Sequence, residues 1–78
     1  MNDERELTFG EKAVGLTFNP SGDGRVAELK QLSAALIDAC AALREGTTDP
    51  EVKRMYSVAI TEAQTAQMWA VKAATWRG

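Results

Sequence analysis

Apolar residues recur at helical spacing along a first segment, between residues 22 and 46. Their three- and four-residue steps place one continuous apolar stripe on a helix face. The stripe comprises Leu29, Leu32, Leu36, Ala39 and Leu43. Val26, Ile37 and Cys40 widen it. A single partner helix would not cover so broad a face.

A second helical pattern extends from residue 50 to residue 76 and uses mostly small side chains. Its stripe consists of Val52, Met55, Ala59, Ala63, Ala66, Ala70 and Ala73. Tyr56, Ile60 and Trp69 fall outside this stripe, so the segment has more than one apolar face. Two helices cannot bury all of these faces, and we therefore expect other subunits to cover the remainder.

Turn-forming residues mark where both helices begin and end. The run Asn19-Pro20-Ser21-Gly22-Asp23-Gly24 offers Ser21 or Asp23 as a helix cap, and Gly46 is a typical stop. Asp49 precedes Pro50, as at a strong helix start. The linker is short enough to make the helices antiparallel neighbours. We expect an all-α hairpin in one domain, residues 1–78, with an irregular or briefly helical arm (1–21) and helices at 22–46 and 50–76.

Composition indicates that a lone copy has little core. The chain has 78 residues, thirteen of them alanine, and only five are aromatic. Alanine buries little apolar area, and short chains leave much of their surface exposed. With one cysteine and no histidine, neither an internal disulfide nor a structural zinc site is expected. We therefore expect an obligate homo-oligomer with no metal and no cofactor.

Charge and residue types exclude several functions. The net charge of −2 gives no general attraction to DNA or RNA polymers or to anionic membranes. The polar amino terminus and the short apolar runs predict neither a signal peptide nor a membrane span, and a lone Cys40 fits a cytosolic setting. Without histidine, and with that cysteine in mid-helix, catalysis is disfavoured. Binding is the better prediction.

A hairpin that turns near residue 47 places Trp69 near Val26 and Lys72 near Asp23. Its open end then gathers a glycine-containing turn, a helix amino terminus with Arg25, an aromatic ring and a lysine. Free amides and basic groups attract phosphate, and aromatic faces stack bases. This combination predicts a nucleotide-sized anionic ligand.

Each of these residues also has a purely structural explanation. Trp69 is by default a core residue. Phe9 and Phe18 can be anchors that pin the arm to the hairpin. Arg25 and Lys30 are by default solvated surface charges. From residue types alone, both interpretations stay open.

Two stretches resemble a known family. The first stretch contains Phe-Gly-Glu-Lys-Ala-Val-Gly at residues 9–15 and Phe-Asn-Pro-Ser-Gly-Asp at 18–23. The second is the run at 62–73, which ends in Met-Trp-Ala-Val-Lys-Ala. Both are similar to phage helical-hairpin proteins that counter bacterial nucleotide signalling. These are the anti-CBASS cyclic-oligonucleotide sponges (CBASS is the cyclic-oligonucleotide-based antiphage signalling system) and the related anti-Thoeris sponges.

The resemblance implies a homohexamer in the host cytoplasm that binds cyclic nucleotide signals without cleaving them. Candidate ligands are cyclic dinucleotides such as 3′,3′-cGAMP, cyclic trinucleotides and cyclic ADP-ribose isomers. By the same resemblance, Phe18 and Pro20 shape the turn, and Lys12 is a phosphate contact. The implied ligand-binding residues are Phe9, Lys12, Phe18, Asn19, Pro20, Ser21, Arg25, Lys30, Thr65, Trp69 and Lys72.

Two other functions stay open beside the sponge. A structural or adaptor hairpin would use its apolar faces to bind protein alone. A phosphodiesterase would cleave a cyclic nucleotide to linear products, and it is the least favoured of the three because catalytic residue types are scarce.

Overall fold

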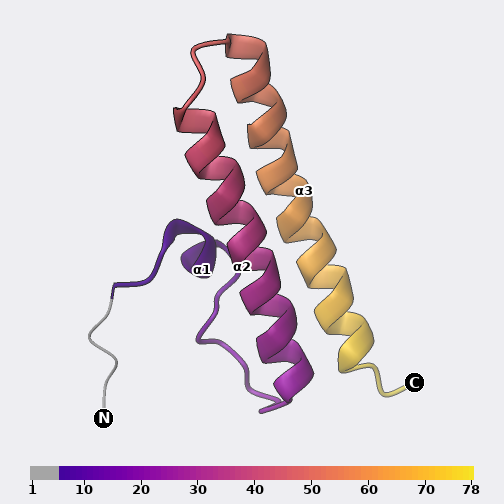
Figure 1. The fold of residues 1–78 in the computed structure, drawn as a ribbon. Helices are drawn as coiled ribbons and strands as arrows, with labels where there is room; N and C mark the ends of the chain where they lie inside the picture. The colour runs from indigo at the N-terminus through magenta and orange to yellow at the C-terminus, as the bar shows by residue number, and fades with distance from the viewer. Residues whose placement is uncertain (1–5) are drawn as a thin grey trace.

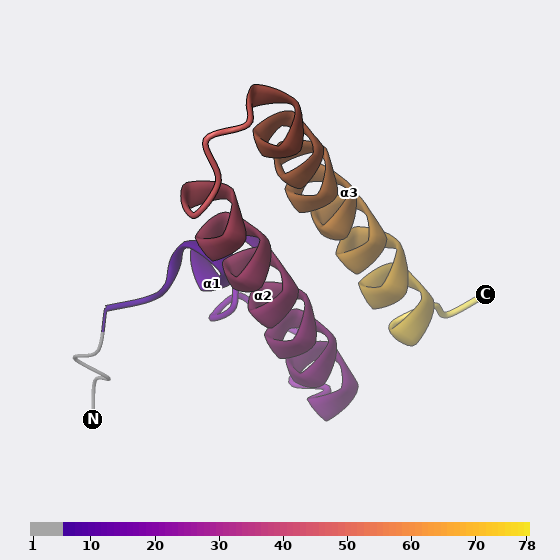
Figure 2. The same cartoon turned by 45° about the horizontal axis from the view of Figure 1, so that its top comes forward.

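A computed structural model gives the fold of residues 6–78, the part of the chain described here. This part contains helices α1 (Phe9–Ala13), α2 (Gly24–Glu45) and α3 (Pro50–Ala74). The two long helices lie side by side and antiparallel, and α1 lies against α2 (Figures 1 and 2). The predicted all-α hairpin is confirmed. Residues 1–5 of the predicted arm, which carry the acidic amino terminus, lie outside the described residues.

The sequence signals for the helix ends act as expected. Asp23 caps α2, its side chain accepting a hydrogen bond from the Arg25 amide at 2.8 Å. Gly46 follows the last residue of α2. Asp49 caps α3 through the Glu51 amide at 2.9 Å. Because these caps satisfy amide groups that a helix leaves unpaired, they fix the points at which the chain enters each helix.

The arm forms one short helix that docks on α2. Thr8 and Glu11 form a capping box: the Glu11 amide donates to Thr8 Oγ1 at 3.1 Å, and the Thr8 amide donates to Glu11 Oε1 at 2.9 Å. Gly10 and Val14 are buried against the hairpin. The arm therefore has a defined position relative to the long helices.

The core is small and lies between the arm, α2 and α3. Its buried members are Val14, Ala34, Ile37, Cys40, Ile60 and Ala63. The molecule is flat, with Cα extents of 44 × 35 × 12 Å. A domain normally buries its core between packed layers, so this flat shape leaves much of both long helices uncovered. Within residues 6–78, no helix has the length and apolar character needed to cross a membrane.

The structure divides the broad apolar face predicted for α2 into a buried part and an exposed part. Leu32, Leu36 and Leu43 do not face α3, because their exposed fractions are 64%, 54% and 56%. The buried face instead carries Val26, Lys30, Ala34, Ile37 and Cys40. A small alanine and a bonded lysine occupy contact positions, whereas the larger leucines lie outside. Of the apolar pattern of this helix, Val26, Ile37 and Cys40 are therefore buried inside the hairpin, whereas Leu32, Leu36 and Leu43 lie on its outer surface.

The predicted stripe of α3 is rotated. Ala63 is buried as expected, but Met55 is 51% exposed and Ala59 and Ala66 are exposed as well. The buried positions are Ile60, Ala63 and Gln67. A polar glutamine at a contact position interrupts the apolar pattern of the buried face, so the periodicity of the alanines predicts a different face.

Candidate ligand-binding site

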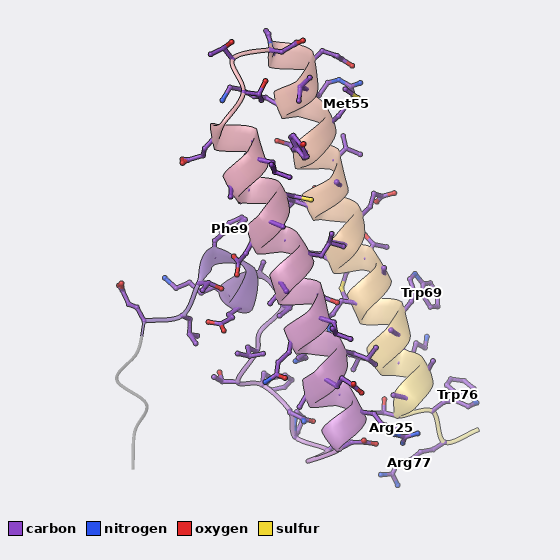
Figure 3. The ribbon with its side chains drawn as sticks, in the orientation of Figure 1. Phe9, Arg25, Met55, Trp69, Trp76 and Arg77 are labelled. Atoms are coloured by element: carbon purple, nitrogen blue, oxygen red, sulfur yellow. The ribbon has the colours of Figure 1, made fainter. Side chains whose placement is uncertain are left out.

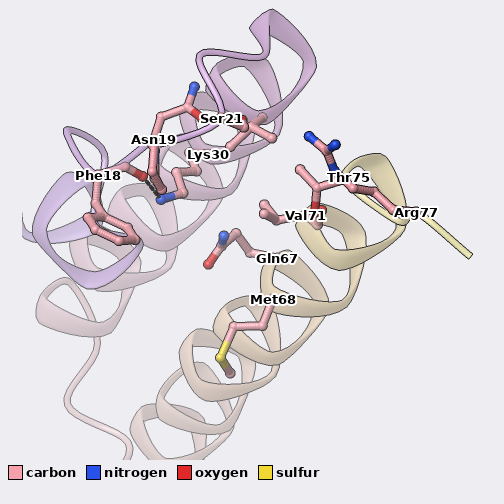
Figure 4. Close-up of a pocket in the computed structure, with 11 residues that line it drawn as sticks. Phe18, Asn19, Ser21, Lys30, Gln67, Met68, Val71, Thr75 and Arg77 are labelled. Carbon is pink, nitrogen blue, oxygen red and sulfur yellow. Dashed lines mark hydrogen bonds between the residues drawn. The ribbon is translucent and has the colours of Figure 1, made fainter.

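A groove opens where the arm meets the start of α2 and the end of α3 (Figure 4). Its volume of about 420 Å³ lies within the range of small-molecule sites. We call it the arm groove. Its lining residues are Phe18, Asn19, Pro20, Ser21, Val26, Lys30, Gln67, Met68, Val71, Thr75 and Arg77.

The arm side of the groove is held in shape by its own hydrogen bonds. Ser21 Oγ donates to Asn19 Oδ1 at 2.7 Å, and the Asp23 amide donates to Ser21 Oγ at 3.1 Å. Asn19 Nδ2 donates to the Asp23 carbonyl at 3.1 Å. Gly22 has φ 66°, in the left-handed region that glycine favours. This wall is therefore formed before any ligand arrives.

Lys30 fastens the arm to α2. Its side chain is nearly buried, with 5% exposure. Nζ donates to the Gly15 carbonyl at 2.9 Å and to the Phe18 carbonyl, and lies 5.5 Å from the centre of the Phe18 ring (Figure 4). The interpretation of Lys30 as a solvated surface charge is therefore wrong. An ammonium group carries three N–H donors, and these two bonds use two of them.

Arg25 closes the open end of the hairpin. Its guanidinium donates to both carboxylate oxygens of Asp23, at 3.1 and 2.7 Å, and to the Ala74 carbonyl at 3.0 Å. The hydrogen bonds from Arg25 lower the pKa of the Asp23 carboxyl below its ordinary value. Arg25 is exposed, but it bridges α2 to the end of α3. It lines a smaller hollow beside the groove with Ser21 and Thr75.

A second group of predicted residues lies on the outer side of α3. Trp69 and Trp76 are 65% and 67% exposed, and both lie on the side of α3 away from α2 (Figure 3). Lys72 Nζ is 5.3 Å from the centre of the Trp69 ring, close enough for a cation–π contact. Thr65 lines a hollow with Trp69 and Lys72. We call Thr65, Trp69, Lys72 and Trp76 the outer face. The interpretation of Trp69 as a core residue fails for the single chain.

The structure brings only some of the predicted site residues together. Phe18, Asn19, Pro20, Ser21 and Lys30 share the arm groove. Phe9 and Lys12 lie on α1 and line none of the groove (Figure 3). Phe9 is 52% exposed and Phe18 is 70% exposed, so neither ring is buried as an anchor of the arm would be. Gly10 and Val14 anchor the arm instead.

Sequence reasoning missed the α3 side of the groove. Gln67, Val71 and Thr75 face the arm, spaced four residues apart. The expected register paired Trp69 with Val26, whereas Val26 shares the groove with Gln67 and Val71. The spacing of Ile60, Ala63 and Gln67 was the available signal for this face.

Met68 connects the two surfaces. It lines both the arm groove and the hollow that contains Thr65, Trp69 and Lys72. The groove and the outer face are therefore neighbours around α3. Trp69 and Trp76 point away from α2 (Figure 3), whereas Gln67, Val71 and Thr75 point toward the arm (Figure 4).

Comparison with known proteins gives the family. The model of the family described as Acb2/Tad1, hairpin domain, matches residues 11–75. No curated protein and no solved structure matches the chain. The matched span contains both long helices, the turn at residues 18–23 and the whole arm groove except Arg77. This protein therefore belongs to the Acb2/Tad1 hairpin family, the family of anti-CBASS and anti-Thoeris sponges.

Proposed function

We propose that this protein captures cyclic oligonucleotide second messengers without cleaving them and so prevents activation of CBASS or Thoeris effectors. Family membership supports cyclic nucleotides as the ligand class. The arm groove is the observation that carries the proposal, because it is a preformed hollow of suitable size with a lysine in its wall. The ligands are cyclic dinucleotides such as 3′,3′-cGAMP, cyclic trinucleotides or cyclic ADP-ribose isomers.

The groove offers the groups that such a ligand needs. The exposed Phe18 ring is a surface on which a base can stack. Lys30 is part of the groove wall, and its ammonium group carries one N–H donor beyond its two carbonyl bonds, which can bind a phosphate oxygen of a ligand. The amide side chains of Asn19 and Gln67 can recognise base edges. These groups bind an anionic, aromatic ligand but include no pair of catalytic acid and base.

We propose that the complete site forms between copies of the chain. In one chain, the predicted ligand residues Trp69 and Lys72 face away from the groove that contains Phe18 and Lys30. They act on one ligand only where the outer face of one copy meets the arm groove of another. The exposed leucines of α2 supply apolar area for such contacts. The proposed assembly is a homohexamer.

Sequestration sets a physical requirement on this site. The protein must hold the messenger at concentrations below those that activate the effector, and each tenfold gain in affinity needs about 1.4 kcal/mol. A groove whose wall is already hydrogen-bonded lowers the ordering cost of binding. The proposed place of action is the cytoplasm of the bacterial host, where these messengers are made.

Thermal unfolding with a panel of nucleotides tests this function. We expect 3′,3′-cGAMP, cyclic tri-AMP or cyclic ADP-ribose to raise the melting temperature, since a ligand at 100 times its Kd stabilises the native state by about 2.7 kcal/mol. The linear dinucleotide pGpA, which is 3′,3′-cGAMP with one phosphodiester opened by water, is the matched control. Native mass spectrometry of the complex should show six chains and ligand of unchanged mass.

The other candidate functions give different results in the same experiment. The uncovered apolar residues of α2 and α3 also suit an adaptor that binds only protein. An adaptor would show a flat melting temperature across the panel. A phosphodiesterase would release linear products, which differ in mass from the cyclic ligand by one water. Either result would refute the sponge.

A further inference from the structure

A carboxylate distant from the groove holds the beginning of the arm. The Gly10 amide donates to Asp38 Oδ1 at 2.7 Å, a bond between positions 28 residues apart in the chain. Gly10 is buried, and a Cβ atom at this position would lie only 2.2 Å from the Ala34 carbonyl oxygen. Only glycine permits this approach without a shift of the backbone. The contact is therefore a specific docking point for α1 on α2.

Between this docking point and the groove, the arm is held against the hairpin by further contacts. Val14 is buried in the core at 5% exposure. Gly15 then turns the chain with φ 63°, and Lys30 binds the carbonyls of Gly15 and Phe18. Asp38 and Lys30 are eight positions apart on α2, which corresponds to about 12 Å along the helix. The arm is thus fixed to one rigid helix at two points.

We infer that Asp38 is a positioning residue for ligand capture, resting on the ligand site proposed above. It lines none of the groove and acts through Gly10. With the carboxylate in place, α1 stays docked and the wall formed by residues 18–21 is held ready for the ligand. Without it, the buried Gly10 amide loses its acceptor, and the docked arm becomes one of several states. The apparent affinity for the ligand is then the intrinsic affinity multiplied by the fraction of molecules whose arm remains docked.

A purely structural role would lower stability without this specific loss of affinity. Ile60→Val is the matched control, because Ile60 is a buried core residue of α3 that lines none of the groove and takes no part in the hydrogen bond between Gly10 and Asp38. It removes one methyl group and lowers the melting temperature. Asp38→Asn is the conservative variant, since its amide oxygen can still accept the bond from Gly10.

The experiment measures affinity by calorimetry for the tightest binder among 3′,3′-cGAMP, cyclic tri-AMP and cyclic ADP-ribose. Asp38→Ala should weaken binding about tenfold, as expected where loss of one charge-assisted hydrogen bond leaves the docked arm in about a tenth of the molecules. Asp38→Asn should stay within about twofold of wild type. Ile60→Val should bind like wild type. In Asp38→Ala, hydrogen exchange at the Gly10 amide should accelerate and then slow again when ligand is added.

Several outcomes overturn the inference. Wild-type affinity in Asp38→Ala would show that the groove does not depend on the docked arm. An equal loss in Ile60→Val would show that affinity merely follows stability. A tenfold loss in Asp38→Asn would show that the hydrogen-bond acceptor is not what matters. If wild-type protein binds none of the three probes, the proposed function fails and this inference fails with it, a result distinct from the other three.

Discussion

Replacing Lys30 by methionine removes the ammonium group that fastens the arm while keeping a long, unbranched side chain. The wild-type group is 5% exposed and donates to the Gly15 and Phe18 carbonyls. Methionine fills similar space with an apolar chain that has no donor. The substitution therefore tests the hydrogen bonds of Lys30 more than its packing.

The expected loss in the free energy of unfolding is the difference between two opposed contributions. Hydrogen bonds from a charged donor contribute about 1.5–3 kcal/mol each, so the two bonds of Lys30 together contribute roughly 3–6 kcal/mol. The desolvation of the charged group in a nearly buried position offsets part of this stabilisation. Methionine is uncharged, so the variant does not have this desolvation cost. We expect a net loss of about 2 kcal/mol in the free energy of unfolding. For a domain of this size, that corresponds to a fall of about 8–16 °C in melting temperature.

Thermal unfolding measures this loss, and both variants are compared at one protein concentration because self-association makes a melting temperature depend on concentration. Lys53→Met is the matched control. Lys53 is exposed and donates to a single carbonyl, that of Arg44, at 3.1 Å. The same change in charge should there lower the melting temperature by no more than a few degrees. Equal melting temperatures for the two variants would refute the assignment of Lys30 as the fastener of the arm.

Three other perturbations have defined outcomes. Gly10→Ala should lower the free energy of unfolding by about 1–3 kcal/mol in denaturant titrations, because its Cβ would lie 2.2 Å from the Ala34 carbonyl; an unchanged midpoint would contradict the close approach. Trp69→Ala should reduce both assembly and ligand affinity, whereas Lys72→Ala should reduce affinity alone, as checked by light scattering and calorimetry; unchanged ligand affinity in Lys72→Ala would exclude a phosphate contact there. The lowered pKa of Asp23 means that its ion pair stabilises the fold above the ordinary pKa of 3.8 and is lost as pH falls through the folded value. The melting temperatures of wild type and Asp23→Asn should therefore converge at low pH, and a constant gap would contradict this role.

Local signals in the sequence were sufficient for the helices but not for the faces they bury. Asp23 and Asp49 cap their helices as predicted, because capping depends only on neighbouring residues. Which face is buried depends on contacts between distant residues. Lys30 occupies a buried position by bonding to arm carbonyls, and no apolar periodicity reveals such a position. The apolar pattern of α2 indicates a face too broad for one partner helix, but not that its leucines are the part left outside.

The candidate site was predictable to a similar extent. The turn at residues 18–23 was recognised by its residue types, and it does form one wall of the groove. The opposite wall depends on the register between α2 and α3. Gln67 and Trp69 are two residues apart and therefore lie about 200° apart around the helix axis, so Gln67 faces the arm while Trp69 faces the opposite side of α3. Register at this precision is set by core packing around Ile37 and Ile60, which a single sequence does not specify.

The distribution of apolar bulk connects assembly with capture. Inside the hairpin, α2 places an alanine and a lysine at contact positions, while its leucines and the tryptophans of the outer face remain uncovered. Copies that cover one another's exposed leucines and tryptophans would gain apolar burial that a single chain lacks. If those contacts bring an outer face to an arm groove, the ligand binds the assembled form in preference to separate chains. Binding and assembly then reinforce each other by thermodynamic linkage, because whatever binds one state preferentially also stabilises it.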